Sequence, residues 1–269
     1  GAINIVTKKR LEHTGSVNVE GGSFAQFNGS LTFGKETENT SIIAHIGTLT
    51  SDGYQENLDY QNTNYFVKAI FNKQKQPIQF IGTFFDKKFG AQNFYTPPAF
   101  EFNEYEETQN SLLGMQTTFR TENFKITPRV YWRRGQDIFL LQRDNPDFYR
   151  NLHITNKVGV EANVSYRSNL GITGFGVDVS RVSISSNNLG DRNRMMANLF
   201  FEHRFRFSKL DITPGIALTY FSDFKFHAFP GIDVGYQISD KLRAYGNVGV
   251  TYRIPTYTDL FYNDASTSG

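Results

Sequence analysis

The stretch LRAYGNVGVTYR, residues 242–253, decides the fold, because apolar and polar side chains alternate along it. One face carries Leu242, Ala244, Gly246, Val248, Val250 and Tyr252, and the other carries Arg243, Tyr245, Asn247, Gly249, Thr251 and Arg253. Successive side chains of a strand point to opposite faces, so this stretch is a strand with one apolar side. About thirteen segments repeat the pattern with no convincing helix between them. The sequence therefore predicts an all-β fold, a transmembrane antiparallel up-and-down β-barrel with lipid outside and a polar lumen inside.

The expected strands share this alternation, and charged residues fall on the side assigned to the lumen. Val160 alternates with Glu161, and Val234 with Asp233, so Val160, Val234 and Val248 are expected to face hydrocarbon. The run at 78–85 is apolar on both faces, which indicates either a packed occupant of the lumen or a slipped register. The segment 2–7 also reads as a strand but belongs to something other than the barrel. The expected barrel strands are residues 15–21, 24–35, 41–51, 64–72, 77–87, 107–120, 124–134, 156–167, 171–183, 193–206, 210–222, 228–238 and 242–253.

The connections between these strands alternate in length. One end has the short joints 36–40, 73–76, 121–123, 168–170, 207–209 and 239–241. The other end has the long joints 52–63, 88–106, 135–155 and 184–192, with shorter ones at 22–23 and 223–227. Outer-membrane barrels have short periplasmic turns and long external loops, whereas a soluble sandwich has no reason to sort its loops in this way.

Composition narrows the class of protein further. Aromatic residues make up 15% of the 269 residues, and the hydrophobic fraction is only 39%, which suits strands with a single apolar face. The net charge is +2 and the basic residues are scattered, so no nucleic-acid partner is expected. There is no cysteine for a disulfide or a thiolate metal site. No window approaches 18 consecutive apolar residues, so insertion by a helix is excluded.

No catalytic or metal-binding motif is present. The five histidines, at 13, 45, 153, 203 and 227, lie on five different segments without metal-ligand spacing. No serine lies in a Gly-x-Ser-x-Gly context, so we expect neither an enzyme nor a cofactor. The carboxylates Glu101, Glu104, Glu106 and Glu107 are of a kind that binds hard cations, but their spacing matches no calcium loop. A solvated loop top explains them better. For the mixed charges of 135–155, we favour ordinary solvation over ligand recognition.

The loop YTPPAFEFNEYEE, residues 95–107, is the best candidate for binding a ligand. Pro97 and Pro98 stiffen it, and aromatic side chains line it. Aromatic loops over a barrel mouth are suited to ligand contact, although packing among the loops explains the same residues. The candidate ligand-binding residues are Phe94, Tyr95, Phe100, Phe102 and Tyr105.

Three stretches resemble the TonB-dependent outer-membrane receptors, especially the vitamin B12 and siderophore receptors. GAINIVTKK at residues 1–9 is similar to the end of that family's plug domain. SDGYQENLDY at 51–60, followed by TNYFVKA at 63–69, resembles its second outer loop and fourth strand. YRIPTYTDLFY at 252–262 resembles the family pattern F-R-x-P-x-x-x-D-L-Y/F-Y, with Tyr252 in place of the more common Phe.

The resemblance implies a receptor that imports a scarce ligand across the outer membrane of a Gram-negative bacterium. The ligand classes it permits are siderophore, cobalamin, haem and glycan. The partners it implies are outer-membrane lipid, the imported ligand and a TonB-type energy-coupling complex that pulls on the plug. It also implies a fragment, in which residues 1–10 end the plug and 11–269 form the N-terminal part of the barrel, about thirteen of 22 strands.

Three alternatives belong to other classes. A passive porin or channel predicts an open lumen with no plug before the barrel. A soluble β-rich binding domain or adhesin predicts that the faces assigned to lipid pack on one another. An enzyme embedded in a barrel requires a nucleophile, a base and an oxyanion donor brought together in space.

Overall fold

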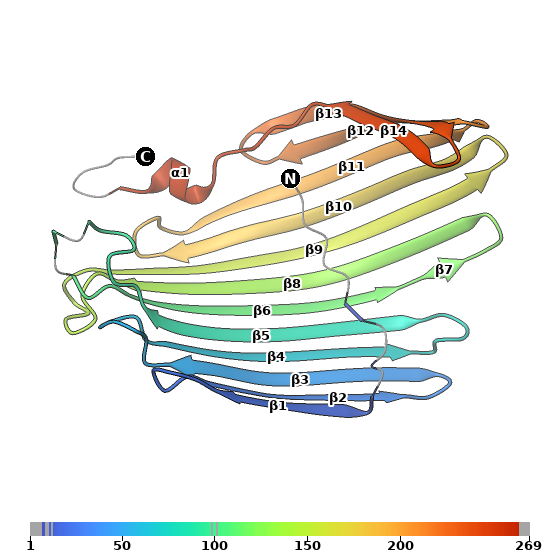
Figure 1. Ribbon diagram of the computed structural model, residues 1–269. Helices are drawn as coiled ribbons and strands as arrows, with labels where there is room; N and C mark the ends of the chain where they lie inside the picture. Colours follow the sequence, from blue (N-terminus) through green and yellow to red (C-terminus); the bar gives the residue numbers. More distant parts are fainter. Residues whose placement is uncertain (1–6, 9–10, 12, 98, 101, 264–269) are drawn as a thin grey trace. The chain divides into compact units, whose positions relative to one another are not determined.

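The computed structural model describes residues 7–8, 11, 13–97, 99–100 and 102–263. Within them, fourteen strands form one sheet whose order follows the chain, with the short β7 paired only to β8 (Figure 1). One short helix, α1 (Tyr257–Phe261), follows the last strand. The strands are β1 (Gly15–Gly21), β2 (Phe27–Glu36), β3 (Thr40–Ser51), β4 (Tyr60–Phe71), β5 (Ile78–Gly90), β6 (Tyr105–Thr117), β7 (Phe119–Arg120), β8 (Phe124–Leu140), β9 (Arg150–Ser168), β10 (Gly171–Ser186), β11 (Arg192–Arg206), β12 (Leu210–Phe221), β13 (Lys225–Ser239) and β14 (Leu242–Gly249).

The antiparallel meander confirms the fold that the alternation predicts. Each expected strand from 15–21 onward has a counterpart, while the expected strand at 2–7 lies outside the described residues. The strands around the longest loop extend further than expected: β8 has 17 residues and β9 has 19, so the loop predicted at 135–155 shrinks to 141–149. A barrel strand needs only about 9–11 residues to cross a bilayer. These two strands therefore continue beyond the membrane-spanning length.

The chain divides by its internal contacts into two units. The first comprises residues 1–115, 132–156 and 184–190, and the second comprises 116–131, 157–183 and 191–269. Within the first unit, β2, β3, β4 and β5 pair in unbroken register, for example Phe27 with Thr50 and Phe71 with Ile78. Within the second, β11 to β14 pair in the same manner, with one irregularity at the turn between Gln237 and Ser239. On the side of β4, the run at 78–85 therefore shows no register slip.

The two faces of the strands differ as the sequence predicts. Val158, Val160, Val234 and Val248 are all exposed, and most other large exposed side chains on the strands are also apolar. The buried apolar residues of the described chain are few and scattered: Ile43, Ala91, Tyr105, Leu140, Ile184, Leu189 and Phe221. An apolar sheet face that stays uncovered fits contact with hydrocarbon and not with a dry interior. In the part of the chain described, no helix is long and apolar enough to cross a membrane.

Candidate functional site

The predicted ligand loop joins β5 to β6 and spans residues 91–104, of which 98 and 101 lie outside the described residues. Its two ends are fastened together, because the Ala91 N–H donates to the Glu104 carbonyl at 2.8 Å. The Asn57 amide from the neighbouring loop donates to the same carbonyl at 2.7 Å and to the Gln92 side chain at 3.2 Å. The loop therefore starts from a fixed base.

A buried carboxylate shapes the first part of the loop. Glu104 is 0% exposed, and its Oε2 accepts the backbone N–H groups of Phe94 at 3.1 Å and Tyr95 at 3.0 Å. Hydrogen bonds from backbone N–H groups to a carboxylate are charge-assisted and roughly twice as strong as neutral ones. By holding these two amides inward, Glu104 turns the preceding chain so that the rings of Phe94 and Tyr95 lie at the surface.

The aromatic side chains of the loop form two ring clusters, one with the end of β8 and one with the loop between β8 and β9. In the first cluster, the Tyr95 ring lies 4.8 Å from Phe94 and 4.9 Å from Phe139, both edge-on. In the second, Phe102 lies 6.1 Å from Phe100 and 6.2 Å from Phe148. Packing accounts for part of this aromatic content, but three of the predicted rings stay exposed: Phe94 at 73%, Phe100 at 56% and Tyr95 at 53%. These three are available to a ligand.

Tyr105 and Arg143 pack against each other where the loop enters β6. Tyr105 is buried, and the Arg143 guanidinium lies 4.4 Å above its ring. Arg143 also makes a bidentate ion pair with Asp59, with N–O distances of 2.6 and 2.9 Å. Its backbone N–H donates to the Asn103 carbonyl at 2.8 Å. One arginine thus joins three loops, a role that the expectation of ordinary solvation for 135–155 missed.

Burial and the surrounding carboxylates change the pKa values of the tyrosine hydroxyls of this site. The Tyr95 hydroxyl donates to Glu106, and burial followed by this hydrogen bond raises the pKa of Tyr95. Burial raises the pKa of Tyr105 to about 12, with a further rise from the hydrogen bond to Glu107. Asp137, on the extension of β8 beyond the membrane-spanning length, is half-buried; burial and then the charge of Glu106 raise its pKa to about 6. The phenols stay protonated at neutral pH, so Tyr95 acts as a hydrogen-bond donor.

The acidic residues predicted as a group are divided among separate partners. Glu104 is buried, Glu106 accepts from Tyr95, and Glu107 accepts from the Tyr105 hydroxyl at 3.0 Å with Lys88 4.0 Å away. Glu101 lies outside the described residues. Among the residues that are described, no three of His, Cys, Asp and Glu are grouped in a way that holds a metal ion.

Glu104→Ala is expected to release the loop start while the barrel stays folded. The amides of Phe94 and Tyr95 lose their acceptor, and hydrogen bonds to charged groups contribute about 1.5–3 kcal/mol each. Hydrogen exchange at these two amides should accelerate by about tenfold or more. Glu104→Gln keeps an acceptor oxygen and should retain most of the protection; equal exchange in both variants and the parent would contradict the role of Glu104.

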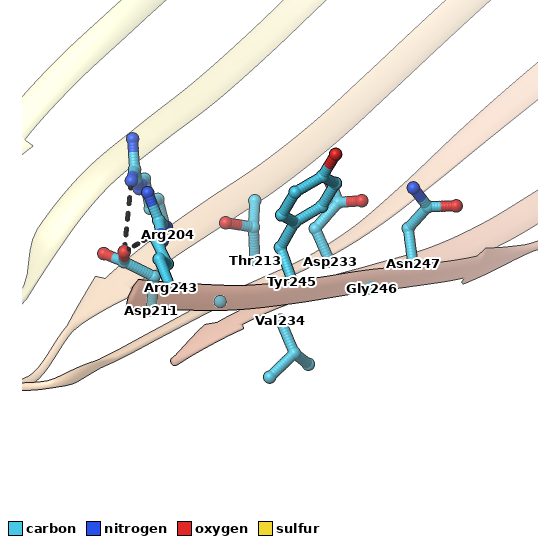
Figure 2. A pocket seen from close by; sticks show the side chains of 10 residues that line it. Arg204, Asp211, Thr213, Asp233, Val234, Arg243, Tyr245, Gly246 and Asn247 are labelled. Atoms are coloured by element: carbon cyan, nitrogen blue, oxygen red, sulfur yellow. Dashed lines mark hydrogen bonds and ion pairs between the residues drawn. The ribbon is translucent and has the colours of Figure 1, made fainter. Parts of the chain in front are cut away.

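A second polar surface lies on the inner face of β11 to β14. Asp211 on β12 accepts from Arg243 on β14 at 2.7 Å and lies 3.4 Å from Arg204 on β11. Arg243 crosses β13 over Gly235, where an added Cβ would lie 2.4 Å from its Nη2. Figure 2 shows the side chains of Thr213, Asp233, Tyr245 and Asn247 on one side of β14 and Val234 on the opposite side. Polar and charged groups of both signs therefore line this inner wall.

Residues 9–269 match the family described as "TonB dependent receptor-like, beta-barrel". The chain belongs to this family. Barrels of the TonB-dependent receptor family lie in the outer membrane of Gram-negative bacteria and belong to transporters that are not enzymes, so the exposed apolar faces contact lipid. The long loops, including 91–104 and 141–149, are external, and the short turns are periplasmic. No curated protein sequence matches the chain.

Solved structures show the same fold at low sequence identity. The ferric-catecholate import receptor Fiu from E. coli K12 is 9% identical with a TM-score of 0.74, over 92% of this chain and 51% of that protein. The copper transporter OprC is 13% identical with a TM-score of 0.74, over 92% and 46%. The siderophore receptor PirA from Pseudomonas aeruginosa is 11% identical with a TM-score of 0.70, over 86% and 40%. The chain thus spans about half or less of the length of these structures.

Proposed function

We propose that this chain is part of a receptor that takes up a scarce ligand across the outer membrane, with energy from a TonB-type complex. Residues 1–10 end the plug in this proposal, and residues 11–269 form the N-terminal part of the barrel. The family match, which begins at residue 9, supports this boundary. Membership of the family supports the energy coupling, which acts through the plug.

The observation that carries the proposal is the set of exposed rings on rigidly held external loops. Phe94, Tyr95 and Phe100 present aromatic surface to the outside, while Glu104 and the Arg143–Asp59 pair hold the loops that carry them. Sites for small molecules combine aromatic lining with a few polar groups that fix orientation. The Tyr95 hydroxyl and the half-buried Asp137 supply such groups beside the rings.

A ferric siderophore is the first ligand class to test. Two of the structures with this fold, Fiu and PirA, are named as receptors for ferric catecholates and siderophores, and a third is named as a copper transporter. Cobalamin, haem and glycans are the other classes to test. Each has hydrophobic or planar surface that the exposed rings can contact.

The triple variant Phe94→Ser, Tyr95→Ser, Phe100→Ser is expected to bind a ferric catecholate siderophore about 10- to 100-fold more weakly. Full burial of one aromatic ring contributes about 1.5–3 kcal/mol, and each 1.4 kcal/mol changes the dissociation constant tenfold. The expected range therefore corresponds to the three rings together losing as much contact as one fully buried ring. The measurement is binding to the full-length receptor in detergent, with radiolabelled uptake into cells that lack other receptors for the same siderophore.

Tyr54→Ser is the matched control, because Tyr54 is an exposed aromatic residue on the neighbouring loop outside both ring clusters. It should leave affinity unchanged. An unchanged dissociation constant in the triple variant, for all four ligand classes, contradicts the assignment of the rings. Uptake that continues without the TonB complex or a proton gradient favours a passive channel instead.

A further inference from the structure

A buried lysine of the sheet binds the described start of the segment that leads into the first strand. Lys68, on β4, is 4% exposed. Its Nζ donates to the Thr7 hydroxyl at 2.7 Å, the Lys8 carbonyl at 3.0 Å and the Thr7 carbonyl at 3.3 Å. Ile43 and Ile81 are its register partners on β3 and β5, so Lys68 faces the segment from the middle of four paired strands.

The hydrogen bonds of the Lys68 ammonium hold Thr7 and Lys8 firmly, although they involve a single side chain. A lysine ammonium has three donors, and here the three acceptors come from two consecutive residues. Charge-assisted hydrogen bonds are roughly twice as strong as neutral ones, and a buried charge that loses its partner is strongly destabilising. Removing Thr7 and Lys8 from the wall therefore costs more than breaking an exposed contact.

Among the described residues, the contacts that follow Lys8 along the chain up to Thr14 are apolar or made by the backbone, and they involve no charged group. Leu11 packs over Gly34, where an added Cβ would lie 2.6 Å from Leu11 Cδ1. The Gly34 N–H donates to the Thr14 carbonyl at 2.8 Å, immediately before β1 begins. Within the described residues, Lys68 therefore makes the first charged contact that a pull from the N-terminal side would meet, and the backbone contact at Thr14 comes seven residues later.

We propose that Lys68 is the anchor that stops a pull on the preceding residues from peeling the chain off the barrel wall. The anchor binds two carbonyls and a hydroxyl, so it holds the backbone path of Thr7 and Lys8. It marks the boundary between the part of the chain that moves under load and the part that stays with the barrel. This inference rests on the proposed function, in which force reaches the barrel through the plug.

The test is force spectroscopy on the full-length receptor in a lipid bilayer, in a background free of other cysteines, pulled by a handle at Ala2→Cys. In the parent receptor, extension should stop at Thr7 until the anchor breaks. In Lys68→Met, peeling should continue at lower force to Thr14. Seven residues at about 3.3–3.6 Å each lengthen that step by roughly 25 Å.

Two variants separate the anchor from general effects of charge. Lys73→Met removes an ion pair with Glu36 at the turn after β4 and should leave the step length unchanged. Lys68→Arg keeps a charged donor and should restore most of the rupture force. A nitroxide on Lys8→Cys, whose side chain is exposed, should become mobile in Lys68→Met without load, whereas one on His13→Cys should not.

Equal step lengths and equal nitroxide mobility in the parent and Lys68→Met would overturn the proposal. Neither measurement depends on ligand binding or uptake. The anchor and the proposed function can therefore be contradicted independently of each other. A receptor that anchors as expected but transports nothing contradicts the proposed function alone. One that transports normally with an unchanged step in Lys68→Met contradicts the anchor alone.

Discussion

Ile216→Arg is expected to destabilise the barrel by about 2–4 kcal/mol, the cost of a basic side chain on the lipid face near the bilayer midplane. Ile216 lies near the middle of β12 and pairs with Phe201 on β11 and Pro230 on β13. It is 41% exposed on the apolar face of the sheet. A guanidinium there has hydrocarbon on one side and the sheet on the other, so its charge loses hydration without gaining a partner.

Thr213→Arg is the matched control on the same strand. Thr213 belongs to the inner face, beside Asp211 and Asp233 (Figure 2), where water and carboxylates accept a new cation. We expect a change within about 1 kcal/mol there. Urea unfolding of the full-length protein in lipid vesicles measures both. Equal losses at the two positions, or a larger loss at Thr213, would mean that the faces are assigned the wrong way round.

Much of the fold could be predicted from the sequence, because alternate side chains of a barrel strand face lipid and water. The polarity of each residue therefore indicates which face it lies on. Only one orientation of the strand places Val160 against lipid and its neighbour Glu161 in water. The same holds for Val234 and Asp233. Strand ends were predicted less well where the strands leave the membrane. The outer parts of β8 and β9 contain mixed polar residues, and the contacts between them include the Thr155 hydroxyl donating to the Gly135 carbonyl at 3.4 Å.

The candidate site could be predicted only in part. Composition alone pointed to an aromatic loop, and Phe94, Tyr95 and Phe100 are exposed on it. What sets their positions depends on contacts distant in sequence: Arg143 and Asp59 are 84 residues apart. The sequence predicts Glu104 as a solvated carboxylate, because the neighbouring residues in the sequence do not distinguish a buried glutamate from an exposed one. Tyr105, predicted to touch ligand, lies buried under Arg143, and its contact with ligand stays a prediction.

In the stretch at 252–262, too, the contacts that fix the segment come from residues distant in the sequence. Its resemblance to the family pattern draws attention to Arg253, yet Arg253 has a side chain that is 82% exposed and lies 3.9 Å from Asp259. The residue that holds this segment is Arg194 on β11, which is 6% exposed. Its Nε donates to Asp223 at 2.6 Å and its Nη1 to the Pro255 carbonyl at 3.3 Å.

Helix α1 depends on this attachment. It has only five residues, too few to be stable alone, although Thr256 and Asp259 form a capping box at its start. The Arg194 guanidinium lies 5.0 Å from the ring of Tyr257, the first residue of the helix. The Tyr257 hydroxyl reaches the Val182 carbonyl on β10 at 3.5 Å. Contacts with β10 and β11 therefore supply the stability that the helix lacks.

Arg194→Met is expected to release residues 250–263 and cost about 2–3 kcal/mol, because Asp223 loses its ion pair and the Pro255 carbonyl its donor. In the full-length receptor, the amides of Leu260 and Tyr262, which donate to Thr256 and Thr258, should exchange about 10- to 100-fold faster. Arg253→Met should change exchange by less than about fivefold, since exposed ion pairs contribute about 0–1 kcal/mol. A larger effect at Arg253 than at Arg194 would show that the pattern's own arginine, and not the buried one, fixes the segment.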